Sequence, residues 1–224
     1  MELRDKKYIY LISSMRSGST LLKALIASRP DATDLPETSF NAAYKVATDK
    51  PLIVVKKPAW YDNYDYPRPF SPMSKKIILI RNPYDTIMSL YRMNEEVGQK
   101  ILNTDLFLIS YWKMVYSNIL TQGLLRQEDI LVVRYEELIS EPVKVSETVF
   151  KFIGTKYPQG TNEYYPPSGY TWKWGKDDGG ECIKTLKVID KIPHRTNDRL
   201  IKLIKNDSEI KNLLSYFGYT KAYY

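Results

Sequence analysis

The sequence predicts an α/β fold, with a central, mainly parallel β-sheet flanked by helices. Along the 224-residue chain, short and almost continuous apolar runs alternate with amphipathic helical segments. A turn of small residues between the first apolar run and the first helix also favours this class. The length suits one domain over residues 1–224, and no internal repeat divides it.

The first predicted strand covers residues 8–12, an apolar and aromatic run that ends at a turn. The helix after this turn ends at Pro30, and its apolar face consists of Leu21, Leu22, Leu25 and Ile26. A nearly continuous apolar run between two prolines, residues 51–58, is typical of a buried parallel strand.

Residues 75–85 begin with a third buried strand, which leads directly into helix signals. Asn82 is a good N-cap, and Pro83 stands at the first helical position, where its missing N–H costs nothing. We expect this helix to end near Asn94. A longer amphipathic helix follows over residues 105–122.

Residues 129–138 supply the fourth predicted strand, and residues 142–152 form a helix with Gly154 just past its end. Prolines, glycines and tyrosines then accumulate over residues 155–181, which predicts a long loop that covers the cofactor or substrate. Two further helices are predicted near residues 195–205 and 208–217. The order of the strands does not follow from these patterns.

The composition is ordinary for a soluble globular protein, with 43% hydrophobic and 26% charged residues. No apolar run approaches the roughly 20 residues needed to span a bilayer. The charged stretch of residues 1–7 is not that of a signal peptide. The single cysteine, Cys182, excludes an internal disulfide and suits a reducing compartment, so we expect a cytoplasmic protein.

The chain carries 33 Lys and Arg against 26 Asp and Glu, a net charge of +7. This excess indicates a polyanionic partner: nucleic acid, an anionic membrane or a highly phosphorylated cofactor. The lysines are spread along the predicted helices and form no dense basic block, a pattern that solubility alone also explains.

The turn after the first strand, Ser17-Gly18-Ser19-Thr20, has the layout of a phosphate-binding loop. Its small residues let backbone N–H groups and the positive end of the next helix converge on one anion. The lysine that ATP and GTP sites place after the glycine is missing, and Arg16 precedes the glycine instead. A tight β-to-α turn with a serine cap is the alternative interpretation.

Cations stand at the C-terminal ends of three predicted strands: Lys56, Arg81 and Arg134. In a parallel sheet these ends line the ligand crevice. A nucleoside-triphosphate hydrolase would end one strand in an aspartate that holds Mg²⁺, and no predicted strand here ends in a carboxylate. The pattern predicts a site that neutralises phosphate without a metal, although an arginine at a strand end is also typical of a surface ion pair.

Four segments resemble the sulfotransferases that use 3′-phosphoadenosine 5′-phosphosulfate (PAPS), in their bacterial and tyrosylprotein-sulfotransferase-like branch. "RSGSTLL" (16–22) is similar to the family's 5′-phosphosulfate loop, and "IRNPYDTIMS" (80–89) to its 3′-phosphate segment. "VRYEELISEP" (133–142) is similar to the segment whose tyrosine lies near the adenine, and "KIPHR…LLSYFGYTKAY" to the C-terminal helices. The resemblance implies a three-layer fold related to that of P-loop NTPases.

The resemblance implies PAPS as sulfuryl donor, 3′-phosphoadenosine 5′-phosphate (PAP) as product, and no metal. The residues that it implies for cofactor binding are Arg16, Ser17, Gly18, Ser19, Thr20, Leu21, Arg81, Ser89, Tyr135 and Lys176. An arginine fork, a hydroxyl and a helix N-terminus together suit the dianionic 3′-phosphate. Lys173 is the alternative to Lys176 in the loop over residues 168–180.

Sulfuryl transfer passes through a loose transition state, so catalysis depends on positioning and electrostatic stabilisation. The resemblance implies that Arg16 holds the 5′-phosphate and the leaving oxygen. It implies that Lys56 stabilises the bridging oxygen or the moving sulfuryl group. It also implies Glu37 as the base for the acceptor proton, with a solvated loop acid as the alternative. If Glu37 is not the base, Asp62 and Asp65 are the first candidates.

We expect a small-molecule acceptor, a metabolite or natural product with a hydroxyl or amine, bound by residues 38–50, 58–72 and 94–105. No nucleic acid or membrane partner is expected, and the enzyme should act as a monomer or homodimer. Two other functions stay open. One is a phosphotransferase or NTPase of related topology; the other is a basic nucleic-acid-binding module, which clustered Lys and Arg with stacking aromatics would indicate.

Overall fold

The structure is a computed structural model, which describes residues 6–35, 48–56, 59, 61, 74–123, 129–165, 183–189 and 196–219. Within these ranges one sheet contains β1 (Lys7–Ser13), β2 (Ala32–Asp34), β3 (Leu52–Lys56), β4 (Lys75–Ile80) and β5 (Ile130–Arg134). Their order is β2-β3-β1-β4-β5, and all neighbouring pairs are parallel. The predicted parallel sheet is confirmed.

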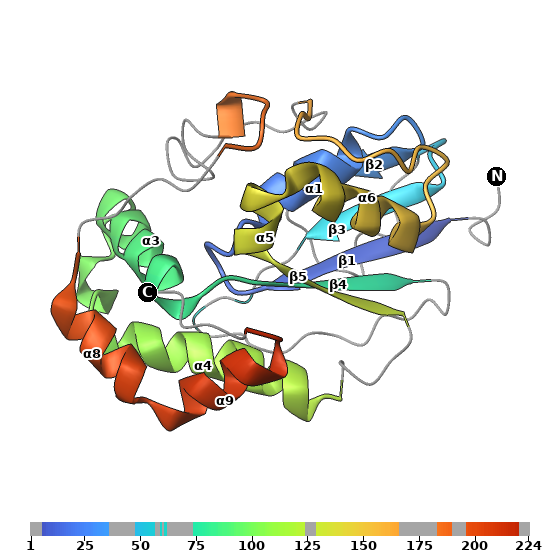
Figure 1. The fold of residues 1–224 in the computed structure, drawn as a ribbon. Coiled ribbons are helices and arrows are strands. Elements are labelled where there is room, and N and C mark those ends of the chain that lie inside the picture. The colour runs from blue at the N-terminus through green and yellow to red at the C-terminus, as the bar shows by residue number, and fades with distance from the viewer. Residues whose placement is uncertain are drawn as a thin grey trace.

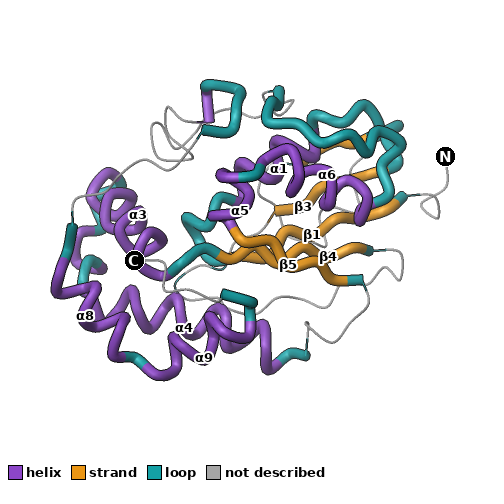
Figure 2. Tube along the Cα trace, in the orientation of Figure 1, coloured by secondary structure: helices purple, strands orange, loops and turns teal. Residues whose placement is uncertain are grey.

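The helices in these ranges are α1 (Ser19–Ala27), α3 (Pro83–Glu96), η2 (Lys100–Leu102), α4 (Asp105–Thr121), α5 (Tyr135–Ser140), α6 (Pro142–Ile153), α8 (Asp198–Asn206) and α9 (Ser208–Tyr216). Figure 1 shows α1, α5 and α6 on one face of the sheet and α4, α8 and α9 on the other. The sheet is the middle layer between them (Figure 2). The predicted three-layer α/β architecture is therefore confirmed.

Side chains of β4 alternate between two apolar cores, one on each face of the sheet. Ile77 and Leu79 belong to the core beneath α1 and α6. Ile78 and Ile80 belong to the core that α4, α8 and α9 cover. All four side chains are fully buried. Because both faces are covered, the strand needs apolar residues throughout, which explains its continuous apolar run.

The structure contains three elements that the sequence patterns do not predict: β2, α5 and the short helix η2. β2 spans three residues, too few to show a strand period. α5 starts directly after Arg134, whereas the sequence predicts a strand as far as residue 138. The strand ends early because pairing with β4 stops at Arg134, and the two glutamates that follow Tyr135 favour the first turn of a helix.

Two predicted helix caps are confirmed. Asn82 caps α3, since its Oδ1 accepts a hydrogen bond from the N–H of Asp85 at 2.9 Å, and Pro83 is the first helical residue. Gly154 closes α6 in the left-handed conformation, with a φ angle of 74°. The first cap fixes the junction between β4 and α3, where Arg81 stands.

The loop predicted over residues 155–181 is described as far as residue 165, and its remainder lies outside the described residues. In the described part of the chain, no helix combines the length and the apolar character needed to cross a bilayer. The organisation of residues 1–224 as one domain stays a prediction.

We expect Ile77→Ala and Ile78→Ala to destabilise the fold to a similar extent, although the two side chains face opposite layers. Each variant loses a fully buried side chain, and such truncations lower the free energy of unfolding by about 2–5 kcal/mol. Val143→Ala on α6 is the control, because Val143 is 50% exposed. Denaturant unfolding followed by circular dichroism compares the three, and a near-neutral effect at either isoleucine would contradict a sheet covered on both faces.

Candidate functional site

The turn between β1 and α1 has a backbone suited to binding an anion. Arg16 and Gly18 have left-handed φ angles, of 63° and 88°. Left-handed residues in such a turn direct successive N–H groups inward and form a concave anion site, a nest. Gly18 is also the N-cap of α1, and it has no side chain to bond the N–H groups of the first turn. The loop therefore presents backbone donors at the positive end of a helix.

Three cationic side chains converge on this loop. Lys56 Nζ donates to Thr20 Oγ1 at 2.7 Å, and Arg81 Nη1 donates to the carbonyl of Arg16 at 3.1 Å. The side chain of Arg16 turns to α3, where its Nε donates to Ser89 Oγ at 3.0 Å. The sheet order explains this meeting, because β3 and β4 flank β1 and end on either side of the loop. The structure thus brings these five sequence-predicted residues together.

The Ser17 hydroxyl belongs to a buried triad beneath the loop. Its Oγ lies 2.5 Å from Ser14 Oγ and 3.1 Å from Tyr116 Oη. Tyr116 Oη also lies 3.2 Å from Ser14 Oγ and donates to the carbonyl of Leu79 at 3.1 Å. Burial raises the pKa of Tyr116, which keeps the phenol protonated for that bond. The Ser17 hydroxyl is therefore engaged in a buried group of hydroxyls beneath the loop, and its backbone N–H belongs to the turn above.

Tyr135 packs between the loop and Arg81. The Arg81 guanidinium lies 4.4 Å from the centre of the Tyr135 ring, a cation–π contact. A Cβ atom on Gly18 would lie 2.3 Å from Tyr135 Cδ2, so the ring can approach this closely because residue 18 is glycine. The tyrosine lies beside the loop as the first residue of α5 and not as a strand residue.

The N-terminus of α3 is bonded to carboxylates. The backbone N–H and the Nδ2 of Asn82 both donate to Glu136 Oε1, at 2.9 and 2.7 Å, and Nδ2 also donates to Asp85 Oδ2 at 2.7 Å. Glu136 thus places a carboxylate at the carboxyl end of the sheet, where the residues at the strand ends predict only cations. In the sequence, the pair of acidic residues after β5 indicates it. Near this helix end, Arg81 and Ser89 are the predicted groups that can meet an anion with their side chains.

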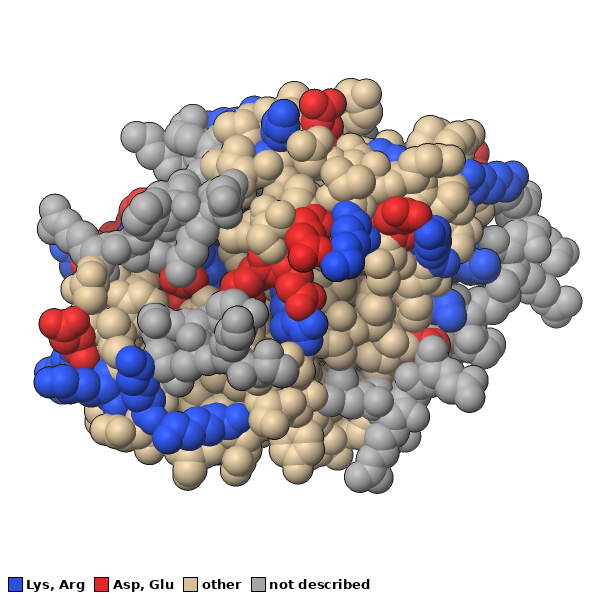
Figure 3. All heavy atoms as spheres, viewed as in Figure 1, with Lys and Arg blue, Asp and Glu red and all other residues tan. Residues whose placement is uncertain are grey.

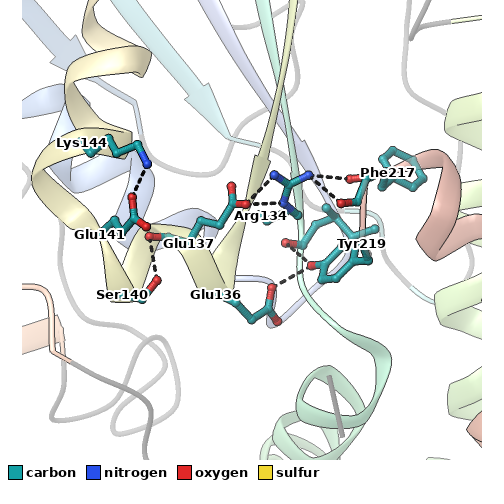
Figure 4. Close-up of polar contacts among 10 residues, drawn as sticks. Arg134, Glu136, Glu137, Ser140, Glu141, Lys144, Phe217 and Tyr219 are labelled. Carbon is teal, nitrogen blue, oxygen red and sulfur yellow. Dashed lines mark hydrogen bonds and ion pairs between the residues drawn. The ribbon is translucent and has the colours of Figure 1, made fainter. Parts of the chain in front are cut away.

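Arg134 does not join the cations at the loop. Its Nη1 donates to the carbonyls of Phe217 and Gly218, both at 3.1 Å, and its Nε donates to Glu137 Oε1 at 2.8 Å (Figure 4). Because α5 begins one residue later, its first turn brings Glu137 back to the strand end. The prediction that Arg134 neutralises phosphate is therefore wrong, and the ion pair is the correct interpretation.

Aromatic residues of α4 form hydrogen bonds with the backbone of the site, and the sequence patterns do not predict this role. Tyr111 Oη accepts a hydrogen bond from the N–H of Met15 at 2.7 Å. Trp112 Nε1 donates to the carbonyl of Arg81 at 3.1 Å. The third such residue is Tyr116 of the serine triad. In the sequence, the sign of this role is a tyrosine or tryptophan on the apolar face of a predicted helix. Once buried, the O–H or N–H of such a side chain usually has a hydrogen-bond partner.

Tyr61, from the aromatic-rich segment between β3 and β4, lies near Arg16. Its phenol donates to Asn94 Oδ1 at 3.0 Å, and its ring centre lies 5.2 Å from that of Phe107 and 4.9 Å from that of Tyr111. Burial raises the pKa of Tyr61 to about 12, although the Asn94 bond and the charge of Arg16 act in the opposite direction. The phenol is therefore neutral near pH 7, and its ring adds an aromatic surface beside the cations.

Other sequence-predicted site residues lie outside the described residues, and their roles stay predictions: Glu37, Asp62, Asp65, Lys173 and Lys176. Ser19 and Leu21 lie in the first turn of α1, where Ser19 is buried and Leu21 packs against the core beneath that helix. Among the described residues, no group of three or more His, Cys, Asp and Glu side chains is arranged to hold a metal ion.

The family model described as the sulfotransferase family matches residues 32–159, more than half of the 224-residue chain. No curated protein matches the chain.

Several solved structures share the fold. The sulfotransferase domain of the olefin synthase from Synechococcus PCC 7002 is 19% identical, with 89% of this chain and 94% of that chain covered and a TM-score of 0.56. The sulfotransferase domain from the curacin biosynthetic pathway is 20% identical, with 97% and 99% covered and a TM-score of 0.56. Retinol dehydratase, in complex with androsterone and inactive cofactor PAP, is 12% identical, with 96% and 82% covered and a TM-score of 0.55. At these identities the likeness is one of fold.

Gly18→Ala should lower the free energy of unfolding more than Gly98→Ala does. Both glycines have left-handed φ angles, of 88° and 75°, and a side chain in that conformation costs about 1–2 kcal/mol. At Gly18 the new Cβ would also meet the Tyr135 ring at 2.3 Å, whereas at Gly98 no described atom lies within 4 Å. Urea unfolding measures both variants, and equal losses would contradict the close packing of Tyr135 on the loop.

Proposed function

The chain belongs to the sulfotransferase family, and we propose that it transfers a sulfuryl group from PAPS to a hydroxyl or amine of a small-molecule acceptor. The observation that carries this proposal is the convergence of Arg16, Lys56 and Arg81 on the loop after β1. Positive charges that contact one loop from three directions favour the binding of a polyanion there. PAPS carries two anionic groups, the 5′-phosphosulfate and the 3′-phosphate.

Two sets of residues fit these two anionic groups. The backbone nest at residues 16–20, together with Lys56, holds the 5′-phosphosulfate. Arg81 and Ser89 hold the 3′-phosphate, and Tyr135 lies near the adenine. Lys176 adds a cation from the loop over residues 168–180. Retinol dehydratase, which has a similar fold, was solved with PAP bound, and this supports the choice of cofactor.

The chain contributes mainly fixed charge to the proposed reaction. Bound PAPS supplies the sulfuryl group, and PAP leaves as the product. Arg16 stabilises the 5′-phosphate and the leaving oxygen, while Lys56 stabilises the bridging oxygen or the moving sulfuryl group. Lys56 is only 3% exposed. Its charge therefore acts through a medium with little water and is weakly screened.

Glu37 is the proposed base that takes the acceptor proton. Leu35 is the last described residue before it, and its N–H bonds the carbonyl of Val54 at 3.2 Å. The Leu35 carbonyl accepts a hydrogen bond from Lys23 Nζ at 3.2 Å. The chain therefore enters the Glu37 segment beside β3, the strand that ends in Lys56. A carboxylate from this segment would take the proton as the new bond to sulfur forms.

The acceptor is proposed to be a metabolite or natural product. Tyr61 lies near Arg16 and packs against Phe107, and this aromatic pair suits an apolar or cationic body next to the reacting group. Two proteins of similar fold are sulfotransferase domains of an olefin synthase and of the curacin biosynthetic pathway, which supports this class. On the face shown in Figure 3, acidic side chains of the described residues gather near the centre, and basic side chains lie beside them and along the lower left edge.

PAP should raise the melting temperature in the presence of a magnesium chelator. A ligand at 100 times its Kd stabilises the native state by about 2.7 kcal/mol, and each kcal/mol raises Tm by about 2–4 °C in a chain of this size. Differential scanning fluorimetry with PAP, and with ATP plus magnesium as the comparison, measures the effect. No shift with millimolar PAP, or a shift with ATP and magnesium alone, would contradict the proposed cofactor.

Glu37→Gln should lower turnover by about 10²–10⁴, the usual loss when a general base is removed. The amide keeps the shape of the side chain but cannot accept the proton, so PAP affinity should stay unchanged. The comparison variant is Lys56→Ala, assayed with the same alcohol acceptor by mass spectrometry of the sulfated product. Full activity of the glutamine variant beside an inactive lysine variant would exclude Glu37 as the base and direct attention to Asp62 and Asp65.

A further inference from the structure

The turn that follows α9 is held against the carboxyl ends of β4 and β5. Arg134 Nη1 binds the carbonyls of Phe217 and Gly218, both at 3.1 Å. Gly218 has a φ angle of 78°, a left-handed conformation that favours glycine, and a Cβ there would lie 2.5 Å from Arg134 Nη1 and displace that group. The next residue, Tyr219, is only 8% exposed. This turn therefore directs a buried phenol toward the site.

The Tyr219 phenol donates to Glu136 Oε2 at 2.7 Å, a contact between residues 83 positions apart in the chain (Figure 4), and its oxygen also lies 3.4 Å from the carbonyl oxygen of Ile80, the last residue of β4. Burial raises the pKa of Tyr219, and the negative charge of Glu136 raises it further. The phenol therefore keeps its proton at physiological pH and acts as the donor. A hydrogen bond from a hydroxyl to a carboxylate is among the stronger ones in proteins.

Glu136 connects Tyr219 to the junction between β4 and α3. Its other oxygen, Oε1, accepts from the backbone N–H of Asn82 at 2.9 Å and from Asn82 Nδ2 at 2.7 Å. The carbonyl of the preceding residue, Arg81, accepts from Trp112 Nε1 at 3.1 Å. The backbone around Arg81 is thus held from two sides, and its guanidinium reaches the loop from this fixed point.

We propose that Tyr219 and Glu136 are positioning residues for the 3′-phosphate of the cofactor, acting through Asn82 on Arg81. This inference rests on the proposed function and extends it to the C-terminal turn. The charge of Glu136 by itself opposes the binding of an anion. What Glu136 contributes to binding is therefore geometry: it fixes the segment from which the Arg81 side chain extends.

The test compares two ligands that differ only in the 3′-phosphate, PAP and 5′-AMP, by isothermal titration calorimetry. Tyr219→Phe keeps the ring but loses the hydroxyl donor, and it should weaken PAP by about 10-fold, as expected for one hydrogen bond to a charged group. Its affinity for 5′-AMP should stay within about twofold of the wild type. Tyr216→Phe is the matched control, because it makes the same change on a side chain that is 70% exposed, and it should alter neither affinity.

A second pair of variants separates geometry from charge. Glu136→Gln keeps an oxygen for Asn82 but replaces the oxygen that accepts from Tyr219 with an amide nitrogen, so it should weaken PAP less than Glu136→Ala, which should weaken it by about 10-fold or more. The ratio of the PAP and 5′-AMP affinities within one variant does not depend on the fraction of folded protein. An unchanged ratio in Tyr219→Phe and Glu136→Ala would overturn the inference, and so would an equal loss in Glu136→Gln and Glu136→Ala. Failure of the wild type to bind PAP would instead overturn the proposed function itself.

Discussion

The hydrogen bond from the Arg81 guanidinium to the Arg16 carbonyl joins the two halves of the site. It connects the end of β4 to the loop after β1 and holds two arginines side by side. Arg16 also has a left-handed backbone, which costs a non-glycine residue about 1–2 kcal/mol. This local strain persists because the surrounding structure fixes the geometry. For the proposed reaction, cations arranged in advance in this way would stabilise developing charge at little cost in reorganisation.

The fixed geometry depends on three aromatic residues of α4, which are buried in the core and also form hydrogen bonds with the site. The bodies of Tyr111, Trp112 and Tyr116 fill the apolar core, and all three are at most 1% exposed. Their polar groups form hydrogen bonds with the site: Tyr111 with the N–H of Met15, Trp112 with the carbonyl of Arg81, and Tyr116 with the hydroxyls of Ser14 and Ser17. One helix thus stabilises the fold by burial and holds the loop by hydrogen bonds. A leucine at any of these positions would keep much of the burial and lose the contact with the site.

Two carboxylates of α5, Glu136 and Glu137, form bonds at the strand ends that carry the cations. Glu136 bonds Asn82 and Tyr219, and Glu137 pairs with Arg134. Both acids come from the first turn of α5, where a negative charge is favourable to the helix dipole. Because Glu137 engages Arg134, that arginine contributes to the attachment of the C-terminal turn. The two other strand-end cations, Lys56 and Arg81, contact the loop instead.

The sequence by itself determined four of the five strands in the described sheet, most helix boundaries and the turn between β1 and α1. Continuous apolar runs indicate buried parallel strands, Asn82 and Pro83 indicate the start of α3, and the small residues around Gly18 indicate a nest. These features depend on local backbone preferences and on burial, which a linear pattern records. The same local patterns could not supply β2, which is too short, or α5, which follows a strand without a break.

Only the tertiary structure decided where the polar side chains point. Ser17 turns its hydroxyl toward Tyr116, 99 positions away, and Arg134 binds Phe217, 83 positions away. Glu136 meets Asn82, 54 positions away. A hydroxyl, a guanidinium or a carboxylate bonds whichever partner the packing of distant elements brings within about 3 Å. Residue type and spacing specify what each of these groups can bond, and the packing of the three layers selects the partner.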